Sequence, residues 1–158
     1  MVRVFFSLCL CLGTMMSLPA HALTVTLYKP NGVAAFSQFM DSQTAVRNVL
    51  QISISEFRLN SDYSYASDDK NLVQINGVGN KSVQYSLNEI RNYGWCYTLN
   101  GTNTDVNAVD AKPSSGSDEI AWFYGYASQV NGEWKVGCYA DNPDLQAAVN
   151  GMRSRHIH

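Results

Sequence analysis

Hydrophobic and polar residues alternate with a period of two along several short stretches of the chain, a pattern typical of β-strands. Leu23–Tyr28 alternates in this way and ends at the turn sequence Pro30–Gly32. Leu72–Ile75 is a short, mostly apolar run that leads directly into Asn76-Gly77. Both stretches therefore predict strands that end in tight turns.

Further strands are predicted in the second half of the chain, where aromatic residues are frequent. Gly94–Leu99 is closed by an Asn-Gly pair, and Asp118–Tyr124 follows a loop of Ser, Gly and Pro. Tyr126–Val130 and Glu133–Tyr139 flank another Asn-Gly pair. Two strand patterns on either side of Asn-Gly are the strongest local signal for a β-hairpin, so we expect one here.

One main helix is predicted from apolar residues spaced by three and four. It covers Thr44–Phe57, with Ser42 as the expected N-cap. Its apolar face consists of Val46, Val49, Leu50, Ile54 and Phe57. The stretch Gln51–Ser55 also alternates as a strand would, so a strand is the alternative there.

The remaining segments complete a prediction of the fold class. Ser86–Asn92 and Asp144–Met152 predict short helices, and Asn60–Asn71, which has no periodic apolar face, predicts a surface loop. Strands and helices in this order favour an α+β fold, in which one main helix and short additional helices cover one face of a small mixed sheet.

The N-terminal 22 residues have the composition of a secretory signal peptide. Arg3 precedes an uncharged apolar run, Val4–Leu18, and Ala20-His21-Ala22 supplies a small-x-small cleavage site. The run is shorter than the roughly 20 residues that a membrane-spanning helix needs. We therefore predict cleavage after Ala22, a single domain over Leu23–His158, and a secreted or periplasmic location.

Net charge bears on the expected partners, and the cysteines bear on a disulfide. Removing Arg3 leaves ten basic and thirteen acidic residues, so neither nucleic acid nor an anionic membrane surface is an expected partner. Cys9 and Cys11 leave with the signal peptide, whereas Cys96 and Cys138 enter an oxidising compartment. We expect these two to form a disulfide; free thiols that act as a nucleophile or as metal ligands are the alternative.

Three segments in a fixed order share their pattern with a known family. They are Ile75-Asn76-Gly77, the stretch Gly94–Gly101 with its Gly-Trp-x-Tyr-x-x-Asn-Gly sequence, and Asp118–Tyr124 with Ile-x-Trp-x-Tyr. The chain thereby resembles the transcobalamin-like C-terminal domain family, known largely from bacterial domains and from the second domain of cobalamin carriers. The resemblance covers Leu23–Tyr124 and departs at Ser117, where the family pattern has Gly. It implies a β-grasp-like sheet.

Catalytic chemistry finds little support in the sequence. His21 leaves with the signal peptide, and His156 and His158 lie in the last three residues, so no histidine is placed to act as a held general base. Two imidazoles alone do not complete a zinc site, and we expect no metal and no cofactor. Carboxylates remain as acid or base candidates. They are Asp62, Asp68, Asp69, Asp105, Asp110, Asp118, Glu119 and Glu133.

Aromatic side chains are the candidate ligand-binding residues. Several share one face of a predicted strand, where they either form the core or line an open sheet face that offers stacking surfaces. The candidates are Trp95, Tyr97, Trp122, Tyr124, Tyr126 and Trp134.

We therefore expect a secreted or periplasmic, non-enzymatic domain that binds a small ligand or a protein through this face and the adjoining loops. Corrinoids and glycans are the small-ligand candidates. One alternative is an exported structural or host-facing interaction protein without a small-molecule ligand. A carboxylate-dependent hydrolase is the other.

Overall fold

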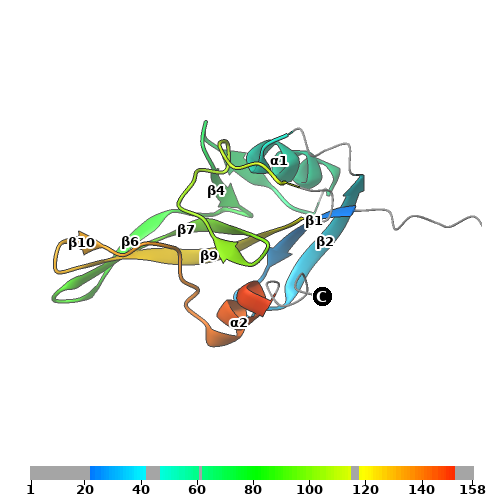
Figure 1. Cartoon of the computed structure of the whole chain (residues 1–158). Helices are drawn as coiled ribbons and strands as arrows, with labels where there is room; N and C mark the ends of the chain where they lie inside the picture. Colours follow the sequence, from blue (N-terminus) through cyan, green and yellow to red (C-terminus); the bar gives the residue numbers. More distant parts are fainter. Residues whose placement is uncertain (1–21, 42–46, 61, 115–117, 152–158) are drawn as a thin grey trace, which may run out of the picture.

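The computed structural model describes residues 22–41, 47–60, 62–114 and 118–151 of the chain. Most of the predicted signal peptide (residues 1–21), the predicted N-cap Ser42, and both C-terminal histidines, His156 and His158, lie outside these residues. Within them, strands dominate and two helices are present, which confirms the α+β class (Figure 1).

The main sheet has seven strands in the order β2-β1-β9-β7-β6, with β10 beside β9 and β8 beside β7. Only β1 and β9 run parallel to each other, so the sheet is mixed as predicted. Its strands are β1 (Ala22–Tyr28), β2 (Ala34–Asp41), β6 (Lys81–Ser86), β7 (Glu89–Leu99), β8 (Thr102–Asn103), β9 (Glu119–Val130) and β10 (Glu133–Trp134).

A second, smaller sheet lies over part of the first, and two helices complete the fold (Figure 1). The small sheet has the order β3 (Tyr65–Ser67), β4 (Leu72–Ile75) and β5 (Val78–Gly79). The helices are α1 (Val49–Leu59) and α2 (Pro143–Gly151).

The two helices cover opposite faces of the main sheet, which corrects the prediction that both lie on one face (Figure 1). Alternate residues of a strand point to opposite faces. On β9, Ile120 and Trp122 belong to the core that contains α1, whereas Ala121 and Phe123 pack with Leu145 of α2. Because β9 is buried on both faces here, its sequence is apolar without alternation, and the pattern could not assign a face to either helix.

Asn-Gly pairs close three hairpins in the described residues. The hairpin at Asn131 was predicted as such, and the other two were predicted as turns that end a strand. Asn76, Asn100 and Asn131 have φ of 50°, 53° and 53°, and each following glycine also has a positive φ. A two-residue turn with positive φ at both positions matches the right-handed twist of the strands that it joins. Asn and Gly are the residues that adopt this conformation at least cost.

Two local predictions were wrong, and one lies partly outside the described residues. α1 begins at Val49, where Asn48 caps it by accepting from the Gln51 N–H at 2.8 Å, whereas the predicted start of the helix at Thr44 lies outside the described residues. The segment predicted as a helix, Ser86–Asn92, is instead the turn between β6 and β7 and the start of β7. The predicted loop Asn60–Asn71 contains strand β3, which pairs with β4. In the last two cases strand pairing overrides the local pattern.

Glu56 of α1 gives the fold a pH dependence. Its residue is 4% exposed, and burial raises the pKa of its carboxyl. A carboxyl with a higher pKa in the folded state binds more protons there than in the unfolded chain, so its contribution favours folding at low pH and is lost as the pH rises through the folded pKa.

We therefore expect Glu56→Gln to raise the melting temperature at pH 7 by a few degrees and to leave it almost unchanged at about pH 3.5, where the carboxyl is protonated in both states. Thermal unfolding at the two pH values measures this. Glu133→Gln is the matched control, because the Glu133 side chain is highly exposed and its replacement should change neither value. An equal gain from Glu56→Gln at both pH values would contradict the role of the charge.

Candidate functional site

A groove of about 870 Å³ lies beside the edge of β7. β6 pairs with β7 as far as Tyr93, and β8 pairs with it from Thr98 onward. Between these points, in the described chain, Gly94–Tyr97 pairs with β9 on one side and with no strand on the other. The interruption leaves a hollow in the sheet edge, which we call the β7 groove.

Four chain segments surround this stretch of β7. The loop before β4 and the first residues of β4 form one wall, and the segment that starts at the last residue of β10 forms another. The start of β6 and the loop after β8 also line the groove, and β6 and β8 pair with β7 on either side of the unpaired stretch. The segments are Asp68 with Asn71–Val73, Trp134–Cys138, Asn80–Ser82 and Thr104–Asn107.

The wall formed by Trp134–Cys138 is held by the predicted disulfide. Cys96 on β7 bonds to Cys138, with their Cα atoms 6.2 Å apart. The Cys138 carbonyl also accepts from Asn103 Nδ2 at 3.0 Å. To reach β7 the segment crosses β9 at Gly125, where a Cβ would lie 2.7 Å from the Tyr139 carbonyl oxygen. Glycine is therefore required at this crossing.

Aromatic side chains fix the other walls by donating hydrogen bonds. Trp95 Nε1 donates to the carbonyl of Val78 at 2.8 Å and so ties the small sheet to β7. Tyr97 donates its hydroxyl to the Val106 carbonyl at 2.6 Å, which holds the loop after β8. Burial raises the pKa of Tyr97, so its hydroxyl stays protonated as this donation requires.

The predicted aromatic candidates occupy three different environments. Trp122 is fully buried and Tyr97 is 7% exposed, so both rings belong to the core under α1. Trp134, in contrast, is 53% exposed. Trp95, Tyr124 and Tyr126 are half-buried. The groove brings together Trp95, Tyr97 and Trp134, while the other three candidates do not line it.

Two of the carboxylates named as acid or base candidates, Asp68 and Asp105, line the groove. Backbone N–H groups of Asn71 and Lys70 hold the pKa of Asp68 below its usual range. The sequence reasoning missed the other polar side chains of the lining, because strand pairing brings them together from separate segments. They are Asn71, Asn80, Asn92, Asn107, Lys81 and Lys135.

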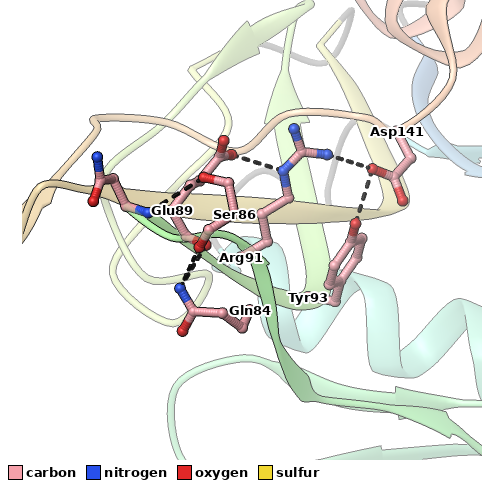
Figure 2. A network of polar contacts seen from close by, with 7 residues as sticks. Gln84, Ser86, Glu89, Arg91, Tyr93 and Asp141 are labelled. Carbon is pink, nitrogen blue, oxygen red and sulfur yellow. Dashed lines mark hydrogen bonds and ion pairs between the residues drawn. The ribbon is translucent and has the colours of Figure 1, made fainter.

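A second polar cluster lies farther along β7 and is shown in Figure 2. The Arg91 guanidinium lies 3.4 Å from the ring centroid of Tyr85 and 4.1 Å from that of Tyr126. Its Nε donates to Glu89 at 2.8 Å and its Nη1 to Asp141 at 3.3 Å. This cluster ties the segment before α2 to the sheet through internal partners, which is a structural role.

The pKa directions of Arg91 and its neighbours agree with a structural role for this cluster. Burial opposes its positive charge, but the contacts with Glu89 and Tyr93 outweigh burial and raise the pKa of Arg91. Burial, together with the negative charge of Asp141, raises the pKa of Tyr124. Tyr93, whose pKa is also raised mainly by burial, donates its hydroxyl to Asp141 at 3.0 Å. Both tyrosines are therefore neutral at physiological pH.

The described residues contain neither a metal-ligand cluster nor a helix that could span a membrane. Among them, no group of three or more His, Cys, Asp and Glu side chains is arranged to hold a metal ion. Neither α1 nor α2 has the length and apolar run needed to cross a lipid bilayer, and the described residues contain no other helix.

Comparison with known proteins found no matching family model, no matching curated protein and no matching solved structure. The resemblance to transcobalamin-like domains therefore stays a prediction based on its three motifs.

Proposed function

We propose that the protein is an exported, non-enzymatic binding domain whose ligand lies in the β7 groove. The observation that carries the proposal is the groove itself. Its volume of about 870 Å³ lies within the range of small-molecule sites, and its lining combines aromatic side chains with several polar groups. Such a lining provides both contact area and orientation for a ligand.

The shape of the groove favours a compact ligand over a long extended one. A peptide that added a strand to β7 would have to continue past both ends of Gly94–Tyr97. Lys81 of β6 already pairs with Tyr93 at one end, and Asn103 of β8 pairs with Thr98 at the other. The ends of an added strand would meet these segments, so a small molecule fits better than a through-running chain.

Binding without turnover is favoured over the hydrolase alternative. Asp68 and Asp105 both line the groove and would be the acid and base candidates there. A glycoside hydrolase needs one carboxyl group with a raised pKa as the general acid. The lowered pKa of Asp68 is opposite to that requirement. The chain also has no histidine between His21 and His156 to serve as another acid or base.

Export is part of the proposal because two features agree with it. Residues 1–22 have the pattern of a signal peptide, and the disulfide between Cys96 and Cys138 is of the kind that persists in oxidising compartments. The proposal includes a β-grasp-like relationship to the transcobalamin-like domains, which agrees with a ligand-binding role.

Ligand binding can be tested with the mature chain, Leu23–His158, in a thermal-shift screen against cyanocobalamin, haem, nucleotides and saccharides. A ligand that binds only the folded state increases the free energy of unfolding, by about 2.7 kcal/mol at a concentration of 100 times its Kd, and so raises the melting temperature. We expect at least one class to produce a rise that Trp134→Ala abolishes. Since Trp134 is exposed, this substitution should leave the melting temperature of the free protein unchanged.

Leu87→Ala is the matched control, because Leu87 is 98% exposed and lies outside the groove. It should retain the ligand-induced rise. A rise that persists in Trp134→Ala would place the ligand elsewhere, and a screen without any rise would count against a small-molecule function. An exported interaction protein would then be the better interpretation.

A further inference from the structure

We infer that the ligand of the β7 groove is a neutral saccharide of one or two rings. This inference rests on the proposed function and narrows it to one chemical class. It is drawn from three properties of the lining: the balance of its charges, the polar groups that remain available, and the exposed aromatic surface.

Opposite charges balance in the groove. Asp68 and Asp105 bring two negative charges, and Lys81 and Lys135 bring two positive ones. Both amines also have other partners. Lys81 Nζ lies 4.9 Å from the centroid of the Tyr93 ring, and Lys135 Nζ lies 3.9 Å from a carboxylate oxygen of Glu133. A phosphate or polycarboxylate would find no excess of cations here, so the lining favours an uncharged ligand.

Two of the groove amides are fixed by internal bonds that leave their N–H₂ groups available. Asn92 Oδ1 accepts from the Ser82 hydroxyl at 2.6 Å, and Asn107 Oδ1 accepts from Asn71 Nδ2 at 3.3 Å. In both residues the oxygen is used, and no described hydrogen bond engages the side-chain N–H₂ group. Donors held in place in this way lose little entropy when they bind a ligand.

The groove lining also offers acceptors. Asp105 has no hydrogen-bond or ion-pair partner among the described residues, and Asp68 uses Oδ1 alone, which accepts from Lys70 and Asn71. Sugar hydroxyls both donate and accept, so they can pair with amide N–H₂ groups and carboxylate oxygens together. A ligand without such hydroxyls would bury these polar groups unpaired, which costs affinity.

Trp134 supplies the apolar surface that a sugar ring also needs. It lines the groove and is half exposed. Pyranose rings carry an apolar C–H face that packs on aromatic rings, while their hydroxyl edge stays free for hydrogen bonds. One exposed indole beside a stretch of β7 that β6 and β8 limit on either side suits one or two sugar rings rather than a polysaccharide chain.

The test uses isothermal titration calorimetry and saturation-transfer NMR on the mature chain, Leu23–His158. The neutral probes are maltose, cellobiose, lactose and N,N′-diacetylchitobiose, and the comparison probes are ADP, glucuronic acid and cyanocobalamin. We expect at least one neutral disaccharide to bind and the comparison probes not to bind. Trp134→Ala and Asn107→Ala should each weaken that binding by about tenfold or more, whereas Trp134→Phe, which keeps an aromatic face, should weaken it less.

Leu87→Ala should bind like the wild type, and the melting temperature of each variant confirms that it is folded. Asn92→Ala is a second polar variant in case Asn107→Ala does not fold. Binding of a comparison probe that depends on Trp134, without any saccharide binding, would overturn the saccharide assignment and leave the proposed function intact. Absence of Trp134-dependent binding by every probe would overturn both.

Discussion

Replacing Cys96 with serine is expected to lower the free energy of unfolding by about 4 kcal/mol, the chain-entropy value for a closed loop of this length. The disulfide joins residues 42 positions apart and closes a loop that contains all of β9, so the unfolded chain gains much freedom when the bond is lost. At this chain length, such a change corresponds to a fall in melting temperature of roughly 10 °C.

Thermal unfolding with and without reductant measures this effect. The double variant Cys96→Ser/Cys138→Ser should match the single variant, and reductant should lower the melting temperature of the wild type but not that of the variants. We expect size-exclusion chromatography to show the same oligomeric state for all forms. A wild-type melting temperature that does not respond to reductant would contradict a stabilising role for the bond.

Loss of the bond should also affect the groove, because Cys138 ends the wall formed by Trp134–Cys138. Without the link to Cys96, this wall keeps the contact of Cys138 with Asn103 and the pairing between Tyr126 and Tyr139. Ligand affinity should therefore fall in the serine variants more than in Leu87→Ala. The disulfide thus connects the stability of the fold with the shape of the proposed site.

Several elements were predictable because their signals are local. Period-two alternation identified β1, and a short apolar run before Asn-Gly identified β4. Asn-Gly pairs marked three turns whose positive φ values only a few residue types adopt easily. The disulfide was predicted because the signal-peptide pattern implies an oxidising compartment and only two cysteines follow the predicted cleavage site. A signal for the start of α1 was also present, since Asn48 and Gln51 form a capping box, but Val46 extended the apolar period and concealed it.

Other features depend on contacts distant in sequence and could not be predicted. Glu89–Asn92 is extended because β7 pairs there with both β6 and β9. The groove likewise exists because β6 and β8 leave part of β7 unpaired, which brings Asn80 and Asn107 to opposite ends of the same hollow. Neither residue stands out in the sequence, since asparagine is common in turns.

Burial of the aromatic residues also could not be predicted from the sequence, because it depends on distant contacts. Alternation correctly grouped Trp122, Tyr124 and Tyr126 on one face of a strand, because side chains two residues apart share a face. Whether that face is buried depends on what covers it. α1 covers the end of β9 with Trp122 but not the end with Tyr126, so burial decreases along a single row of side chains.

Replacing the fully buried Trp122 with alanine is expected to cost about 3–5 kcal/mol of stability, the range for large-to-small substitutions of aromatic residues in a core. The ring packs against Tyr97 with centroids 5.3 Å apart, and its Nε1 donates to Ser53 Oγ at 2.7 Å. Ser53 in turn donates to the Val49 carbonyl of α1. The alanine variant would lose both the volume and the link between sheet and helix.

Chemical denaturation of matched variants separates these two contributions. Ser53→Ala removes the acceptor alone and leaves a buried indole N–H unpaired, so it should cost about 1–3 kcal/mol. Trp122→Phe keeps most of the volume and should lie between Ser53→Ala and Trp122→Ala. Trp134→Ala should fall within about 0.5 kcal/mol of the wild type, because its ring is exposed. If Trp122→Ala instead kept wild-type stability and abolished ligand binding, its ring would be a ligand contact, and the assignment of this face to the core would be wrong.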